Sequence, residues 1–134
     1  MPRDSIEVIR MHGAKAAFGE TRSATFGKAA AAAPFAIHTL GLGSGVATLA
    51  AEGAEHQVLA GMIAKWLLTG EDRWTFPGAT LPSADGSDND WVHSLLGAIS
   101  SCSRSDYRMA QTEAMGYVGW IKKLAQALCS MEDG

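Results

Sequence analysis

The segment LGLGSGVATLAAEG, residues 40–53, has the glycine spacing best suited to holding a phosphate group. Gly41, Gly43 and Gly45 alternate with other residues ahead of an expected helix. A Walker-type loop ends in Gly-Lys-Ser or Gly-Lys-Thr, and a dinucleotide loop follows a strand with the spacing G-x-G-x-x-G. Here no such lysine follows, and the sixth position is valine. We therefore expect a bend between two packed helices, where Gly41 ends the first in the left-handed conformation and Ser44 caps the second.

Histidine and cysteine are the next residue types to consider, because both can bind a metal or take part in nucleophilic catalysis. There are six of them: His12, His38, His56, His93, Cys102 and Cys129. The histidines form no H-E-x-x-H motif and no pair four residues apart, so we expect no metal site and no cofactor. Two cysteines are too few for a disulfide scaffold or a structural zinc, and we expect free thiols. A site assembled from these residues in three dimensions remains the alternative, in a free-standing helical enzyme or regulator.

The elements that would position these residues are helices. The alternation typical of strands is nearly absent, and alanine, the best helix former, is abundant. The clearest helix follows Asp106, where apolar residues recur in steps of three and four: Tyr107, Ala110, Ala114, Tyr117, Val118, Ile121, Leu124, Ala125 and Leu128. Ser103 and Ser105 are its candidate N-caps. Inside it, Glu113 is expected to form a salt bridge or cap a neighbouring helix end rather than act as a general base.

Besides the short helix after the glycines and the C-terminal helix, four helices are expected, at residues 4–21, 26–38, 55–68 and 90–100. Pro34 should kink or restart the second of these, because proline removes a backbone donor. The third should bury one stripe of side chains: Val58, Met62, Ile63, Trp66 and Leu67. With 134 residues, the chain is expected to be all-α, a compact helical bundle of about five to seven helices forming a single domain over residues 1–134.

A long loop is expected at about residues 70–89, where prolines, glycines and acidic residues gather. Loops of that length are usually functional or mobile in small domains. Gly70 stands where a helix C-terminal glycine belongs. Trp74, Phe76 and Leu81 are expected to pin the first half of this loop to the bundle.

The net charge argues against strong, non-specific binding of nucleic acid by the free chain. Its net charge is -3 at pH 7, and only 19% of its residues are charged. The first residues show no signal-peptide pattern, and the most apolar run, residues 29–42, is too short to cross a bilayer. We expect a cytoplasmic protein with no membrane partner.

The C-terminal segment YRMAQTEAMGYVGWIKKLAQAL carries a resemblance to a known family. It resembles the closing pattern of the small helical subunit of type III-B CRISPR (Cmr) effector complexes. The matching positions are Tyr107, Thr112, Glu113, Ala114, Tyr117, Trp120, Ile121, Lys122, Lys123, Leu124 and Ala125. The Gly-Leu-Gly bend and Lys65-Trp66-Leu67 are also similar, and the likeness covers about residues 20–128. The second helix departs from the pattern because it is alanine-rich where family members often carry several basic residues. The acidic loop has no counterpart that we can place.

The resemblance implies a non-enzymatic structural subunit with an all-α fold. Such subunits stack beside the crRNA-bearing backbone subunits and neighbouring copies of themselves, touch the large subunit, and help hold crRNA and target RNA in antiviral defence. The nuclease activity belongs to other subunits. Trp66, Trp120 and Tyr117 are expected to be core or interface anchors, since a large rigid ring buries much area.

Five basic residues are the candidates for contact with RNA: Lys28, Lys122, Lys123, Arg22 and Arg108. The competing interpretation is that these residues form a solvated helix face, as surface lysines usually do. No aromatic residues alternate with these charges in a stacking pattern, so we expect phosphate contacts rather than base reading.

Overall fold

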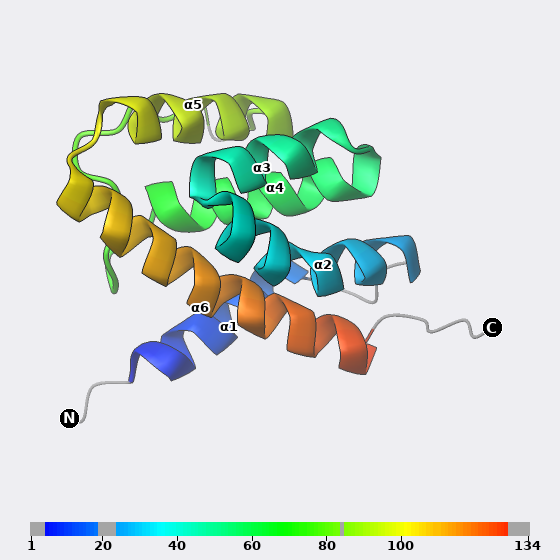
Figure 1. The fold of residues 1–134 in the computed structure, drawn as a ribbon. Helices are drawn as coiled ribbons and strands as arrows, with labels where there is room; N and C mark the ends of the chain where they lie inside the picture. The colour runs from blue at the N-terminus through cyan, green and yellow to red at the C-terminus, as the bar shows by residue number, and fades with distance from the viewer. Residues whose placement is uncertain (1–4, 19–23, 84, 129–134) are drawn as a thin grey trace.

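The computed structural model describes residues 5–18, 24–83 and 85–128. These ranges hold six helices and no strand: α1 (Ile6–Phe18), α2 (Ala24–Leu40), α3 (Leu42–Ala51), α4 (Ala54–Leu68), α5 (Asp88–Ser101) and α6 (Arg104–Leu128) (Figure 1). The predicted all-α bundle of five to seven helices is confirmed. Within these ranges, no helix combines the length and apolar character needed to span a membrane.

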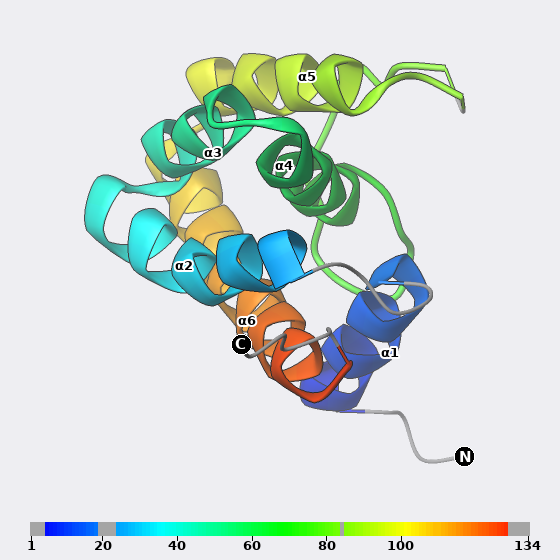
Figure 2. The ribbon, with the colours of Figure 1, turned by 90° about the vertical axis from the view of Figure 1, so that its right-hand side faces the viewer.

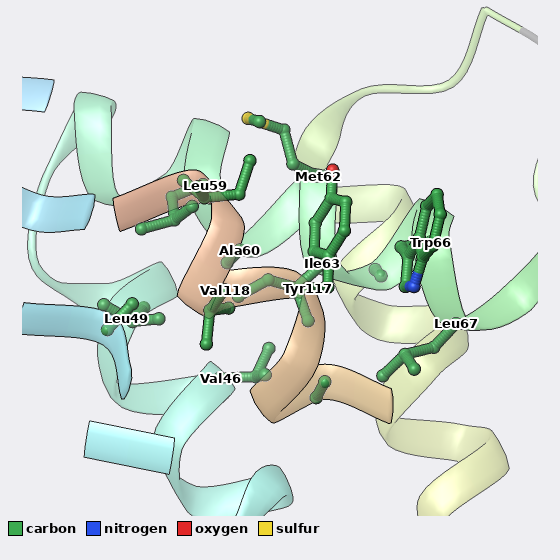
Figure 3. Close-up of a cluster of buried hydrophobic side chains, with 14 of the residues drawn as sticks. Val46, Leu49, Leu59, Ala60, Met62, Ile63, Trp66, Leu67, Tyr117 and Val118 are labelled. Atoms are coloured by element: carbon green, nitrogen blue, oxygen red, sulfur yellow. The ribbon is translucent and has the colours of Figure 1, made fainter. Parts of the chain in front are cut away.

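Two helices, α4 and α6, contact most of the others. α4 packs against α2, α3, α5 and α6, and α6 packs against α1, α2, α3 and α4. α5 lies at one end of the bundle and α1 at the other, while α2 and α3 lie together on one side (Figure 1, Figure 2). Side chains from α3, α4 and α6 meet in the core, where Val46, Leu59 and Val118 are buried (Figure 3).

Helix α6 follows the predicted apolar pattern. Ala110, Ala114, Val118 and Ile121 are fully buried. Of the two candidate caps, Ser103 is the one used, because the Asp106 backbone N–H donates to Ser103 Oγ at 3.0 Å. Ser105 already lies inside the helix.

Helix α4 is buried far more widely than the single predicted stripe. Its buried residues are Leu59, Ala60, Gly61, Met62, Ile63, Ala64, Trp66, Leu67 and Leu68. Val58, placed in the stripe by the sequence pattern, is only partly buried. The stripe was too narrow because α4 is surrounded by four helices, so most of its circumference faces protein.

Helix α2 runs through Pro34 as one element, so, of the predicted kink or restart at this residue, the restart is excluded. Proline removes one backbone donor, but burial of the surrounding turns holds the helix together across it. Ala29, Ala30, Ala33 and Ile37 are all fully buried around this site. Packing against α6, α3 and α4 thus outweighs the missing hydrogen bond.

The bend between α2 and α3 consists of Gly41 alone. Its backbone has φ 87° and ψ 162°, in the left-handed half of backbone space that favours glycine, which confirms that part of the prediction. The Gly41 N–H still closes the last turn of α2 by donating to the Ile37 carbonyl at 3.0 Å. The predicted cap at Ser44 is wrong, because α3 begins at Leu42 and Ser44 lies inside it.

The segment between α4 and α5 is packed against the core by the two predicted aromatic anchors, Phe76 and Trp74. Phe76 is buried, and its N–H donates to the Leu67 carbonyl at 3.0 Å. Trp74 packs edge-on against Phe76, with ring centroids 5.0 Å apart. The predicted anchor Leu81 is wrong, since its side chain is 48% exposed. A capping box between Ser87 and Asp90 then starts α5 earlier than the apolar pattern suggested.

Candidate functional site

The glycine bend is held by two side chains of α6. The Leu42 N–H donates to Gln111 Oε1 at 2.8 Å, and the Gly43 N–H donates to the Tyr107 hydroxyl at 3.5 Å. Gln111 Nε2 in turn donates to the Ile37 carbonyl at 3.0 Å. A phosphate at this helix start would need the same free N–H groups. These donors are already engaged, so the glycines serve the packing of α2, α3 and α6.

Gln111 therefore joins three helices, and replacing it tests this role. Gln111→Leu should lower the free energy of unfolding by about 2 kcal/mol, because it leaves the Leu42 N–H without a partner and removes one of the two donors to the Ile37 carbonyl. Urea denaturation followed by circular dichroism measures the change. Thr112→Ala, at an exposed neighbouring position, is the control and should stay within about 0.5 kcal/mol of the parent. Equal destabilisation of both variants would contradict the role of Gln111 in joining the three helices.

Glu113 is a buried carboxylate at the meeting point of α1, α4 and α6. It is 5% exposed and accepts three hydrogen bonds. Trp66 Nε1 donates to Oε2 at 2.7 Å, while Arg10 donates through Nε to Oε2 at 3.1 Å and through Nη2 to Oε1 at 3.0 Å. The predicted salt bridge is confirmed. Because both oxygens are engaged by donors of the same chain, Glu113 has a structural role here.

The ion pair also affects Arg10. Hydrogen bonding to Glu113 raises the pKa of Arg10 above its ordinary value, and partial burial of the guanidinium offsets part of the rise. Room for the guanidinium is provided by Gly116, where a Cβ atom would lie 2.5 Å from Arg10 Cζ. The ion pair therefore depends on the absence of a side chain at Gly116 as well as on its two charges.

Trp66 is enclosed by its neighbours. Tyr117 stacks on its ring with centroids 4.5 Å apart (Figure 3). The Arg73 guanidinium carbon lies 3.4 Å from the ring centroid. At the ring edge, a Cβ atom on Gly13 would lie 1.9 Å from the indole. Trp66 is 6% exposed and Tyr117 1%, so both are core residues rather than open stacking platforms. Burial raises the pKa of the Tyr117 phenol, and the charge of Arg73 partly opposes that rise.

Trp120 differs from this core pair. It is partly buried, and its Nε1 donates to Glu7 Oε1 at 3.2 Å across the α1–α6 contact. The Lys123 ammonium lies 4.7 Å from its ring centroid. The three residues form a surface cluster in which Lys123 is held by a cation–π contact.

The structure gathers some of the predicted RNA-contact residues and separates others. Lys28 is exposed near the start of α2, Lys123 is exposed and Lys122 half-buried toward the end of α6. Both views place the start of α2 beside the last turns of α6 (Figure 1, Figure 2). Arg108 is exposed near the other end of α6, about 21 Å from Lys122 at 1.5 Å per residue. Arg22 lies outside the described residues.

The alternative enzyme hypothesis depended on the histidines and cysteines. In the part of the chain that the structure describes, His, Cys, Asp and Glu side chains form no group of three or more that could hold a metal. His56 of α4 approaches Glu52, which follows the last residue of α3, at 3.5 Å. The Cys102 thiol, half-buried at the end of α5, donates to the Ile99 carbonyl at 3.3 Å. Cys129 lies outside the described residues.

Three residues of these clusters were missed by the sequence reasoning: Arg10, Arg73 and Gln111. Only Gln111 left a signal, because it follows Tyr107 by four residues and so shares its helix face. The other two act across long separations or from the irregular segment after α4, where spacing carries no such information.

A comparison with known protein families matches residues 9–128 to the family described as CRISPR-associated protein (Cas_Cmr5). The matched span is 120 of 134 residues and includes the bend, Trp66 and Glu113. No curated protein and no solved structure matches the chain.

Proposed function

The chain belongs to the Cas_Cmr5 family of CRISPR-associated proteins, and on that premise we propose that it is a non-catalytic small subunit of a type III-B CRISPR (Cmr) effector complex. In this role it works in the cytoplasm, packs along the backbone and large subunits beside neighbouring copies of itself, and helps hold crRNA and target RNA. The family match over residues 9–128 is the observation that carries the proposal.

The non-catalytic part of the proposal is supported by how the most reactive-looking groups are used. The N–H groups of the glycine bend donate to Gln111 and Tyr107. The Glu113 carboxylate is occupied by Arg10 and Trp66. Groups engaged in this way hold helices together and present nothing to a substrate. The purified chain, with or without a divalent metal, should neither hydrolyse ATP nor cleave RNA.

The RNA-holding part of the proposal is supported by the cations near the end of α6. Lys28 lies near the start of α2, and Lys122 and Lys123 lie toward the neighbouring end of α6. Neighbouring copies in an assembly would repeat these cations. A single chain with net charge -3 should bind RNA weakly, whereas repeated cations add their phosphate contacts.

Charge reversal at the two adjacent lysines tests this role. Lys122→Glu combined with Lys123→Glu should leave the helical spectrum unchanged and weaken target RNA capture by the assembled complex. The slope of log affinity against log salt should fall by about one for each phosphate that a lysine no longer neutralises. Filter binding of target RNA across a salt series measures both quantities.

A control variant separates the effect of Lys122 and Lys123 on RNA capture from a general effect of reversing a surface charge. Lys15→Glu reverses an exposed lysine of α1 and should leave both capture and salt slope nearly unchanged. If the double variant assembles and captures target RNA as the parent does at low salt, the two lysines form only a solvated face. Failure of the parent chain to co-purify with Cmr subunits and crRNA would instead contradict the subunit assignment itself.

A further inference from the structure

A cavity runs along α4 between α1 and the start of α5. Its volume is about 310 Å³, which is the size of a small-ligand site, and none of the lysines proposed to contact RNA lines it. The α4 wall extends from Val58 to Thr69, about 16 Å at 1.5 Å per residue. Gly13 of α1 and Asp88 of α5 also line it, so three helices enclose the cavity.

A buried hydroxyl group without a hydrogen-bond partner lines this cavity. It belongs to Tyr117, which is 1% exposed, and it bonds to none of the residues that the structure describes. The Tyr117 ring reaches from α6 toward α4, with its hydroxyl on the side of Met62, another lining residue (Figure 3). Burying a hydroxyl without a hydrogen bond is costly, so we expect a polar atom of a bound molecule beside it.

Two opposite charges lie at the exposed side of the cavity. Lys65 is exposed and Asp88 is half-buried, and both line the cavity. The Lys65 ammonium lies 5.7 Å from the ring centroid of Trp91, which follows Asp88 by three residues, so both charges lie near the first turn of α5. Within the described part of the chain, neither side chain forms an ion pair.

A third charge of the lining, that of Arg73, is already matched within the chain. Its guanidinium donates to the carbonyls of Trp66 and Thr69, and its Nη1 donates to Asp72 Oδ1 at 3.0 Å. The side chain is 9% exposed and is fixed by these bonds. The charges left for a ligand are therefore one cation and one anion.

The remaining lining is apolar and excludes stacking of a nucleobase. Met62 is buried and Val58 partly buried, and both pack with the core. Tyr117 and Arg73 cover the Trp66 ring, so this ring offers no open face to a base. The cavity is thus suited to an aliphatic group and two opposite charges rather than to RNA.

We propose that this cavity binds a free amino acid with an apolar side chain. Asp88 receives the ammonium of the ligand and Lys65 its carboxylate, while the side chain contacts Met62 and Val58. The Tyr117 O–H donates to the carboxylate. A molecule with both charges matches both residues, whereas a simple anion is repelled by Asp88 and a simple cation by Lys65. This binding activity goes beyond the proposed subunit function and uses other residues.

Isothermal titration of the purified full chain tests the ligand class. The probes are L-leucine, L-methionine and L-phenylalanine, with isocaproate and isoamylamine as leucine analogues that lack the ammonium or the carboxylate. At least one amino acid should bind with a dissociation constant of about 1 mM or below. Both analogues should bind at least tenfold more weakly than L-leucine, because each loses a charge-assisted contact. Absence of binding by all three amino acids, or isocaproate binding as tightly as L-leucine, would overturn the proposal.

Variants of the two charged residues locate the site. Asp88→Asn and Lys65→Met should each weaken binding of the best amino acid at least tenfold. Asp85→Asn and Lys15→Met make the same changes at exposed positions outside the cavity and should bind as the parent does. Circular dichroism should show unchanged helix content in all four. Parent-like binding by Asp88→Asn and Lys65→Met would show that any bound amino acid lies elsewhere, which overturns the proposal.

Tyr117→Phe separates binding from folding. The variant removes a hydroxyl that has no partner in the described chain, so its melting temperature should not fall, while amino-acid affinity should drop severalfold. A lower melting temperature with unchanged affinity would assign the hydroxyl to the fold and overturn its part in the site. Because these titrations use the isolated chain, their failure leaves the co-purification test of the proposed function unaffected.

Discussion

Glu113→Ala is expected to lower the free energy of unfolding by about 3 to 5 kcal/mol. The substitution leaves the Arg10 guanidinium, whose side chain is only 15% exposed, without its counter-charge, and Trp66 Nε1 without its acceptor. Breaking a buried pair from one side costs more than the pair contributes, because a desolvated charge remains. For a domain of this size the melting temperature should fall by about 10 °C or more. Urea and thermal denaturation measure the destabilisation.

Two variants separate the buried cluster from ordinary surface contacts. Glu7→Ala removes an exposed carboxylate that also accepts from a tryptophan, Trp120, and should cost about 1 kcal/mol or less. Arg10→Met combined with Glu113→Leu removes both charges and should recover part of the stability, although Trp66 Nε1 stays unpaired. If Glu113→Ala costs no more than Glu7→Ala, the buried pair does not hold α1 in place.

Gly13→Ala is expected to lower the free energy of unfolding by about 2 to 3 kcal/mol, although alanine favours helices. The added Cβ would lie 1.9 Å from the Trp66 indole. That ring cannot move aside easily, because Tyr117 and Arg73 cover it and Glu113 holds its N–H. Helix α1 would therefore have to shift away from α4. Thermal denaturation, with near-ultraviolet circular dichroism of the tryptophans, reports both effects.

Gly119→Ala is the matched control for this substitution. Gly119 also lies inside a helix, but a Cβ atom built there has no neighbour within 4 Å. The variant should therefore be more stable than the parent by about 0.5 to 1 kcal/mol, the propensity difference alone. If both substitutions stabilise the protein, the contact between Gly13 and Trp66 is looser than the structure indicates.

The helices were predictable where one side of a helix faces the core and the other faces solvent. Helix α6 has that arrangement, so its apolar residues recur at the helical period and its cap at Ser103 could be named. The same rule underestimated α4. A helix covered on most sides has no polar stripe to set its buried face apart, and only the tertiary arrangement identifies it.

The details that failed depend on groups distant in the chain. Ser44 was a reasonable cap by local rules, but the start of α3 is satisfied by Gln111, 69 residues away from Leu42. Leu81 had the right polarity for an anchor, yet its side chain is exposed, and Phe76 and Trp74 pack that segment against the core. Local propensity does not contain such contacts.

Of the buried ion pair, the carboxylate could be predicted from the sequence and the cation could not. Glu113 stood out as a carboxylate within an apolar helical pattern, and a salt bridge was the expected result. Its partner was not identifiable, because Arg10 lies 103 residues away on a helix of mixed composition. The carboxylate could be recognised from its own surroundings, whereas the cation could be recognised only in three dimensions.

Because α6 follows α1, α2, α3 and α4 in the chain and packs against all four, it imposes an order on folding during translation. While residues 104–128 are still inside the ribosome, the earlier helices lack the surface that covers Ala14, Phe26 and Ile37. The nascent chain therefore emerges with part of its apolar surface uncovered, and its core closes only once α6 has left the ribosome.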